Sequence, residues 1–218
     1  MGQRSLGVTL AAAALVASGV APAGAAAQAS FPADADQVVT VVADSPSATT
    51  ATLTAWERDG GGWVPVRGPV AVFVGKDGIG QASETTSHTP AGTWSLTEAF
   101  GIQPAVTRLP YRQVTTSDWW VSDVRSPHYN THFSCAPGTC PFDEAAGENL
   151  GKAGPVYNQA VVIDYNRRPV VPGAGSAFFL HVTGGRPTAG CVAIPAADLD
   201  AILRWLDPAR RPVIEISA

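Results

Sequence analysis

The stretch GAGSAFFLHVTGGRPTAGCVAI, residues 173–194, decides the fold and the chemistry of this chain. Its apolar run from Ala177 to Leu180 predicts a buried strand that delivers His181 at its end. A glycine-rich turn follows, and Thr188-Ala-Gly-Cys191 then leads into a second short apolar run. Such a turn can bring a strand-borne imidazole and a loop-borne thiol face to face.

A thiol beside an imidazole is an arrangement used in nucleophilic catalysis. Cysteine attacks carbonyl carbons as the thiolate, and a neighbouring imidazole takes its proton and stabilises the charged form. Gly190 lets the backbone approach closely, so the amides around Gly190 and Cys191 are expected to face a developing oxyanion, with Thr188 hydrogen-bonded within the turn. The alternative is a buried structural cysteine beside a histidine satisfied in the core.

Strand patterns recur on both sides of this stretch. Many short strands with Gly and Pro turns predict a mainly β single domain, a sandwich or an open barrel. One segment, Ala196 to Leu206, has the apolar spacing of a helix, and residues 138–154 are expected to form a surface loop. The expected strands are residues 37–42, 50–58, 63–66, 69–74, 119–124, 156–164, 177–182 and 213–216.

The start of the chain has the pattern of a secretory signal peptide. Arg4 is the only charged residue before Asp34, residues 6–20 are apolar or small, and several A-x-A cleavage options follow. Glycine, serine and proline interrupt this run below the ~18–20 apolar residues that a membrane span needs. We therefore expect a secreted, extracytoplasmic protein.

This pattern divides the chain into three parts. We expect residues 1–29 to be the signal peptide, residues 30–48 a leader with the first strand, and residues 49–218 the catalytic domain.

Charge limits the partners of the protein. With 14 Lys and Arg against 18 Asp and Glu, the net charge is −4. Binding to a phosphate backbone requires a broad positive field, which this balance does not provide. We expect no nucleic acid partner, no membrane span and a monomer.

The three cysteines divide into a pair and a single thiol. Cys135 and Cys140 flank Ala-Pro-Gly-Thr, a turn-forming tetrapeptide, and a local disulfide is the natural pairing in an oxidising compartment. Cys191 is then left unpaired, and an odd cysteine in a secreted protein indicates a reactive thiol or an intermolecular partner.

His128 and His132 precede this pair and form with it a set that resembles metal ligands. Prolines at both ends of the segment disfavour a continuous helix, so we expect no metal. Tyr129 and Asn130 are expected instead to line a substrate groove.

At its thiol and imidazole the sequence resembles the catalytic domain of L,D-transpeptidases of the YkuD type, secreted bacterial cysteine enzymes that act on peptidoglycan. That family carries a His at a strand end, a glycine-rich stretch and a [Ser/Thr]-x-Gly-Cys motif. The matching elements here are His181, Gly184-Gly185 and Thr188-Ala-Gly-Cys191. A second match lies upstream, where GKDG (75–78) precedes TPAGTW (89–94).

The resemblance is to a branch with a short loop. Nine residues separate His181 from Cys191, and Ala189 and Ala193 stand where the commoner pattern has a histidine and a cationic or amide residue. The nucleophile and the base carry over, whereas these two auxiliary residues do not. Arg186 in the short loop is expected to supply a positive charge to the substrate.

The resemblance implies a protein associated with the cell wall and a two-step acyl transfer that needs no metal or organic cofactor. Cys191, activated by His181, attacks the carbonyl between an L-centre and a D-centre of a stem tetrapeptide. A side-chain amine of a neighbouring stem then takes the acyl group, and a backbone carbonyl of Val182 or Thr183 orients the imidazole. Two alternatives stay open: an L,D-carboxypeptidase with the same dyad, and a non-catalytic cell-wall binding domain.

Overall fold

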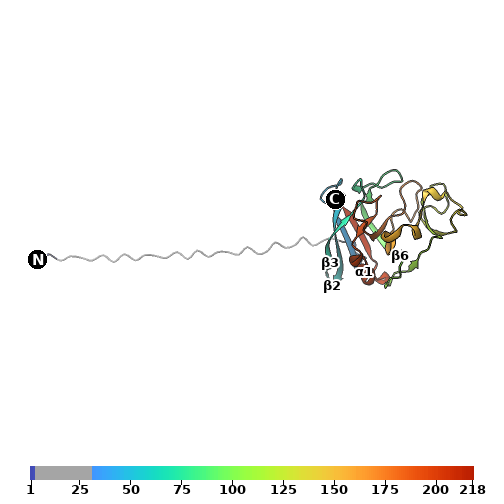
Figure 1. Cartoon of the computed structure of the whole chain (residues 1–218). Helices are drawn as coiled ribbons and strands as arrows, with labels where there is room; N and C mark the ends of the chain where they lie inside the picture. Colours follow the sequence, from blue (N-terminus) through green and yellow to red (C-terminus); the bar gives the residue numbers. More distant parts are fainter. Residues whose placement is uncertain (3–30) are drawn as a thin grey trace.

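The computed structural model describes residues 1–2 and 31–218 (Figure 1). The predicted signal peptide therefore lies outside the described residues, apart from its first two. Within the described part, strands dominate and α1 (Ala196–Trp205) is the one α-helix, so the mainly β fold class is confirmed. No helix in this part is long and apolar enough to cross a membrane.

The strands of the described chain range from two to twelve residues, and four short 3-10 turns connect some of them. The strands are β1 (Gln37–Val42), β2 (Thr50–Asp59), β3 (Gly62–Phe73), β4 (Ile79–Gly80), β5 (Thr89–Pro90), β6 (Gly92–Gly101), β7 (Tyr111–Gln113), β8 (Asp118–Val121), β9 (His132–Ser134), β10 (Gly147–Asn149), β11 (Ala160–Ile163), β12 (Phe179–Val182), β13 (Val192–Ile194) and β14 (Val213–Ser217). The 3-10 turns are η1 (Glu144–Ala146), η2 (Leu150–Lys152), η3 (Gly154–Tyr157) and η4 (Pro208–Arg210).

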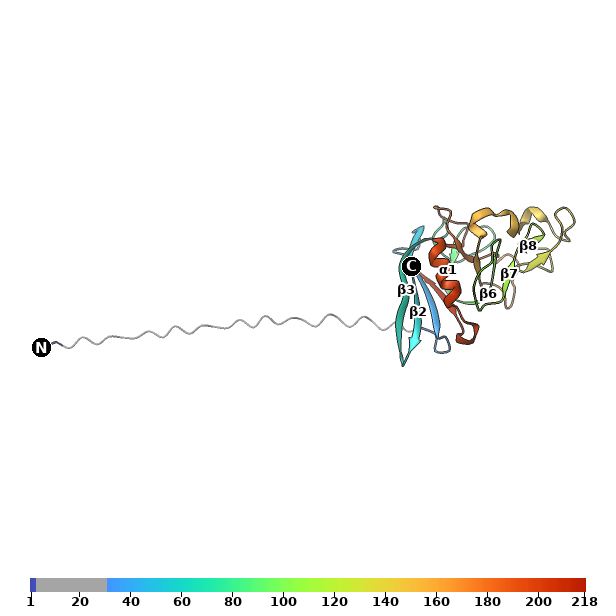
Figure 2. The ribbon, with the colours of Figure 1, turned by 60° about the horizontal axis from the view of Figure 1, so that its bottom comes forward.

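The main sheet closes on itself. Its strand order is β11-β12-β13-β3-β2-β1-β14-β6-β7, and an additional pairing of β11 with β6 joins the ends, so that all of these strands except β7 form a ring. The β2–β3 hairpin lies at one end of the molecule, and β8 lies at the other (Figures 1 and 2). Figure 2 also shows α1 between these two ends.

The hairpin illustrates how the sequence produces this sheet. Along β2 the side chains alternate, with Leu53 and Ala55 fully buried and Thr54 between them partly exposed. The turn after β2 uses Gly60 and Gly61, whose φ angles of 55° and 109° suit a tight hairpin loop. β3 (Gly62–Phe73) then runs as one strand, whereas the sequence predicted two, residues 63–66 and 69–74. The strand stays continuous because a bulge absorbs Gly68 at φ 102°.

Apolar side chains pack on both faces of β11 and β12. Val161 and Leu180 belong to the larger core inside the ring, which the apolar stripe of α1 joins. Val162 and Phe179 point the other way, into a second cluster that also contains Cys191. The thiol therefore sits on the outer face of the barrel, under the segments that follow β7.

Two segments differ from the sequence prediction. Residues 156–164 were expected to form one strand, but η3 occupies the first part because Pro155 stands at the start of a helical turn, and β11 begins only at Ala160. Residues 138–154 were expected to form a surface loop, yet they contain η1, β10 and η2. β10 forms because Gly147–Asn149 pairs with β8, a partner distant in the chain.

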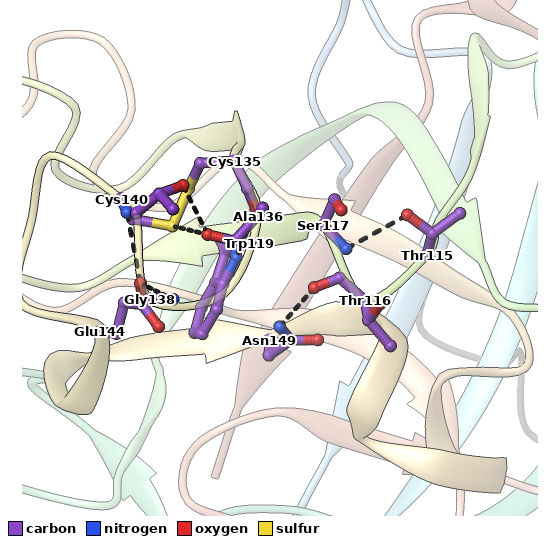
Figure 3. The surroundings of a disulfide bond; sticks show 11 residues. Thr115, Thr116, Ser117, Trp119, Cys135, Ala136, Gly138, Cys140, Glu144 and Asn149 are labelled. Atoms are coloured by element: carbon purple, nitrogen blue, oxygen red, sulfur yellow. Dashed lines mark hydrogen bonds between the residues drawn. A yellow bond between two sulfur atoms is a disulfide. The ribbon is translucent and has the colours of Figure 1, made fainter.

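A small sheet, in the order β10-β8-β9, covers the outer cluster. Cys135 and Cys140 form a disulfide beside it, as predicted (Figure 3). The Trp119 indole donates to the Cys135 carbonyl at 3.2 Å, and the Glu144 carboxylate accepts from the Gly138 amide at 2.7 Å. The disulfide thus closes the loop after β9 on itself, and these hydrogen bonds connect that loop to β8 and η1.

Removing this disulfide is expected to lower the thermal stability of the protein. A disulfide that closes a loop of this length restricts the unfolded chain and thereby stabilises the fold by about 2 kcal/mol. The Cys135→Ser/Cys140→Ser double variant should therefore melt about 4–8 °C lower. Thermal unfolding followed by circular dichroism measures this. A reducing agent should lower the melting temperature of the wild type and leave that of the variant in place; an equal response of both proteins would contradict the prediction.

Candidate active site

His181 lies near the end of β12, in the middle of the main sheet. β12 pairs with β11 on one side and with β13 on the other, with Leu180 opposite Val192. Side chains alternate along a strand, and Leu180 enters the barrel core whereas Phe179 joins the outer cluster of Cys191. The imidazole of His181 therefore leaves β12 on the same face of the sheet as the thiol.

A backbone carbonyl fixes the imidazole. His181 Nδ1 lies 2.8 Å from the carbonyl oxygen of Val182, which can only accept a hydrogen bond, so Nδ1 carries the proton and Nε2 carries the lone pair. The expectation that Val182 or Thr183 orients the ring is thus met by Val182. His181 is only 7% exposed, and this burial lowers its pKa below the ordinary value. The ring is neutral at neutral pH and available as a base.

The thiol of Cys191 is buried and points toward backbone groups. It is 9% exposed, and its Sγ lies 3.4 Å from the carbonyl oxygen of Ala177, to which the thiol donates, while the Phe179 amide contacts the sulfur. Burial, and secondarily the carboxylate of Glu148, raise the pKa of Cys191 above its usual value. Among the described residues no hydrogen bond joins Sγ to His181, so this state holds a neutral, resting thiol.

Asn130 holds the segment that contacts the thiol. Its side chain is 2% exposed, and its Oδ1 accepts from the Ala177 amide at 3.2 Å and from the Trp120 indole at 2.9 Å. Its Nδ2 donates to the carbonyls of Tyr165 and Asn166. Ala177 has a φ of 58°, which this contact helps to maintain. Asn130 was predicted to line a groove, but the structure places it beneath the site as a positioning residue.

The turn before Cys191 is held by the Thr188 hydroxyl. This hydroxyl donates to the Cys191 carbonyl at 2.6 Å and accepts from the Gly190 amide at 3.0 Å. The Gly190 amide is therefore engaged within the turn and does not face an oxyanion in this state. Gly190 itself has a φ of 145°, and an added Cβ would lie 2.6 Å from the Phe178 ring. Glycine is required at this position for close packing.

Cys191 opens onto a cleft of about 320 Å³. A larger hollow of about 500 Å³ lies elsewhere, around Trp94 and Asp164, and does not contain the thiol; His181 is in the lining of neither. Because the Cys191 thiol lines the smaller cleft, that cleft is the candidate active site. Its lining includes Glu84, Ser122, Glu148, Ser176, Phe178 and Cys191.

Glu148 in β10 is a residue of this cleft that the sequence gave no reason to choose. Its carboxyl is half-buried opposite Trp120, and its Oε2 has no hydrogen-bond partner among the described residues. Burial raises the pKa of Glu148 to about 7, against a smaller opposing effect of the Tyr157 phenol. The sequence alone did not single out Glu148, because this residue lies in a polar stretch that was expected to form a loop.

Tyr157 at the end of η3 packs against His181 and lies in the same buried cluster as Cys191. Its ring stands edge-on to the His181 ring with centroids 5.4 Å apart, and its phenol interacts with both the Glu148 carboxylate and the Cys191 thiol. Burial, with the neighbouring Glu148, raises the pKa of Tyr157 above its usual value. Tyr157 therefore links the base, the nucleophile and the carboxylate as a neutral phenol.

The raised pKa of Glu148 predicts a pH-dependent contribution to stability. Between pH 4.5 and about 7 the folded protein keeps a proton on Glu148 that the unfolded chain has released. The contribution of Glu148 to the free energy of unfolding is therefore fully present below pH 4.5 and is lost as the pH rises through about 7. Glu148→Gln should therefore melt higher than the wild type at pH 8, by about 3 °C, and show no difference at pH 4.5. Thermal unfolding at both pH values measures this, and an offset independent of pH would contradict it.

Two further predicted substrate residues do not line the cleft. Tyr129 is 3% exposed; its hydroxyl bonds to the Glu84 carboxylate and accepts from the Gly175 amide at 3.2 Å. It therefore acts on the cleft only through Glu84. Arg186 is exposed in the loop after β12. In this conformation of the loop, Arg186 does not line the cleft and does not bring the expected positive charge to it.

The set of histidines and cysteines around residue 130 does not form a metal site. Both of its cysteines are in the disulfide, and His132 Nε2 lies 2.8 Å from Asp118 Oδ1. Over residues 31–218, no group of three or more His, Cys, Asp or Glu side chains is arranged to hold a metal ion. That the reaction needs no metal stays a prediction.

Comparison with known proteins gives one match. The family profile described as YkuD: L,D-transpeptidase catalytic domain matches residues 39–214, a range that contains Cys191, His181, Glu148 and Tyr157. No curated protein and no solved structure matches the chain significantly. Since the profile covers most of the chain, the protein belongs to the YkuD family of L,D-transpeptidase catalytic domains, a family of peptidoglycan enzymes.

Proposed function

We propose that the protein is a secreted cysteine acyltransferase that acts as a monomer and cross-links peptidoglycan stem peptides. The observation that carries this proposal is the placement of the Cys191 thiol, which lines an open cleft, and the His181 imidazole on one face of the sheet in a member of this family. The Val182 carbonyl leaves His181 Nε2 free to accept a proton.

The first half-reaction forms a thioester. His181 Nε2 takes the thiol proton, and Sγ attacks the carbonyl carbon between the L-centre and the D-centre of a stem tetrapeptide. The carbon–nitrogen bond then breaks, and the imidazolium returns its proton to the departing D-amino acid. The Ala177 carbonyl, which holds the resting thiol, must give up its proton donor in this step.

The second half-reaction releases the acyl group. An amine of a neighbouring stem forms the cross-link, whereas water produces a trimmed tripeptide. Both outcomes use the same thioester on Cys191, so the identity of the acceptor separates a transpeptidase from an L,D-carboxypeptidase.

Export is proposed on two grounds. Residues 1–29 have the pattern of a signal peptide, and the disulfide between Cys135 and Cys140 is of the kind that persists in oxidising compartments. The N-terminal sequence of the protein recovered from the cell envelope or the medium tests this: a start near residue 30 supports export, and a start at Met1 contradicts it.

The function is tested with purified protein and a disaccharide-tetrapeptide, followed by intact-mass spectrometry of protein and products. An acyl adduct together with a tetrapeptide–tripeptide dimer supports transpeptidation. An adduct with tripeptide and no dimer favours the carboxypeptidase. If neither adduct nor product forms, and the thiol alkylates fast only after unfolding, Cys191 is structural and the chain is a binding domain.

A further inference from the structure

The cleft beside Cys191 is negatively charged. The charged side chains that line it are two carboxylates, Glu84 and Glu148, and its remaining lining is polar or apolar and uncharged. A cleft with this lining favours a cationic group over the carboxylates that stem peptides also carry.

The two carboxylates differ in their partners. Glu84 is hydrogen-bonded to the Tyr129 phenol. Glu148 has one oxygen that is buried and without a hydrogen-bond partner in the described part of the chain. An unpaired buried carboxylate oxygen is costly, because the group has lost water and gained no donor. A ligand that supplies a charged N–H donor at this point would remove that cost.

Glu148 is also placed beside the reacting sulfur. Glu148 and Cys191 line the same cleft, and the negative charge of Glu148 acts on the Cys191 thiol. A group bound to Glu148 in the cleft therefore lies next to an acyl group carried on Sγ.

We propose that Glu148 binds the ammonium group of the acceptor amine and takes its proton when the amine attacks the thioester. This assignment rests on the proposed acyl transfer and adds to the nucleophile and base a third catalytic residue, which selects amine over water.

The step balances in atoms and charge. The acceptor enters as R–NH3⁺ against the Glu148 carboxylate. Its nitrogen forms a bond to the acyl carbon, the carbon–sulfur bond breaks, and the electron pair of that bond returns to Sγ. Of the three protons on nitrogen, one passes to Glu148, one to Sγ of Cys191, and one stays on the new amide. A carboxyl group whose pKa is near the working pH is suited to this proton transfer.

The charge preference of the cleft can be measured without substrate. Cys191 is treated with two thiol reagents of similar size, cationic 2-aminoethyl methanethiosulfonate and anionic 2-sulfonatoethyl methanethiosulfonate, and intact mass gives both rates. Because both reagents react with the same thiolate, the ratio of the two rates on one protein does not depend on the fraction of Cys191 that is ionised. In Glu148→Gln the cationic-to-anionic ratio should fall about tenfold or more relative to the wild type, as expected when a buried charge partner is removed.

Two variants control this measurement. Glu84→Gln removes the other carboxylate of the cleft, which already has a partner, and should lower the ratio less than about threefold. Glu148→Asp retains the charge and should keep most of the preference. The proposal is overturned if Glu148→Gln leaves the ratio within about twofold of the wild type, or if Glu84→Gln lowers it as much.

If Glu148→Gln does not fold, the wild type provides the same test through pH. The cationic-to-anionic ratio should fall between pH 7.5 and pH 5, because Glu148 takes up a proton across its pKa of about 7. The titratable groups around Glu148 include Tyr157 and Cys191, whose pKa values are raised above this range, and Glu84 in the same cleft. His181 lies beside Tyr157, and burial lowers its pKa below 6.5. The fall in the ratio that is assigned to Glu148 is therefore the part between pH 7.5 and pH 6.5, where His181 stays neutral. A ratio independent of pH over this interval contradicts the assignment.

A second experiment follows the acceptor. With disaccharide-tetrapeptide, the dimer-to-tripeptide ratio is measured for the wild type and for Glu148→Gln, alongside the acyl adduct in the same samples. Glu148→Gln should lower this ratio about tenfold or more. A larger loss of tripeptide than of dimer means that Glu148 activates water and overturns the assignment. Absence of the adduct in the wild type refutes the proposed function instead, while the reagent ratio still tests Glu148.

Discussion

Cys191→Ser should lower the rate of acyl-adduct formation and of product release at least about 10³-fold. The hydroxyl is nearly isosteric with the thiol and can still donate to the Ala177 carbonyl, so the fold should be retained. Its much higher pKa, in a site that already disfavours an anion, leaves the neutral His181 unable to generate a nucleophile. Intact-mass spectrometry with the disaccharide-tetrapeptide measures both quantities.

The matched control for this variant removes the other two sulfur atoms. Cys135→Ser/Cys140→Ser lacks the disulfide and keeps the nucleophile, so it should still form the adduct at a temperature where it is folded. An adduct on the Cys191→Ser protein, or product formed at the wild-type rate, would show that the acyl group is carried elsewhere.

His181→Gln should lower the rate of adduct formation about 10²–10⁴-fold, the range for loss of a general base. Because burial lowers the pKa of His181, the wild-type rate should rise with pH along a limb that lies below the ordinary value of 6.5. Adduct formation should be fast above this pKa, where the imidazole is neutral, and slow below it, where the imidazole is protonated. Adduct formation measured from pH 4.5 to pH 8 tests this.

In the same experiment the pH limb assigned to His181 should disappear from the His181→Gln profile. His128→Gln is the control, since His128 packs on Phe133 away from the thiol and should leave the profile in place. A pH limb that persists in His181→Gln would assign the titration to another group, and Glu148 would be the first to examine.

The positions of His181 and Cys191 could be predicted because they follow from local patterns. An apolar run that ends in a histidine and a turn bounded by glycine each occupy fewer than about ten residues, and burial of one face sets their direction. The same holds for β1, β14 and α1, which end within one residue of their predicted limits. The catalytic roles of these two residues stay a prediction.

Glu148 and Tyr157 could not be predicted in the same way. A strand as short as β10 has no periodicity, and Glu148 acquires its place only through pairing with Trp120 in β8. Tyr157 lies in an apolar run that suggested a strand, and the helical turn at Pro155 instead carries its ring over His181. Both placements depend on contacts between segments distant in the chain.

Asn130 shows a different limit. A polar residue next to a tyrosine in a loop suggested contact with substrate, but its φ of 56° and its four hydrogen bonds make it part of the support. Sequence reasoning has no means to distinguish a polar side chain that faces a ligand from one that satisfies buried backbone groups.

The resting state of Cys191 affects how easily its thiol is oxidised. Peroxides and other oxidants attack cysteine as the thiolate, and the damage is irreversible once the sulfinic stage is passed. A sulfur that is 9% exposed and held protonated beside a carboxylate presents very little thiolate to such oxidants. In a protein exported as proposed, this low thiolate content should slow the oxidative loss of Cys191 in a compartment that has no cytoplasmic thiol system to repair it.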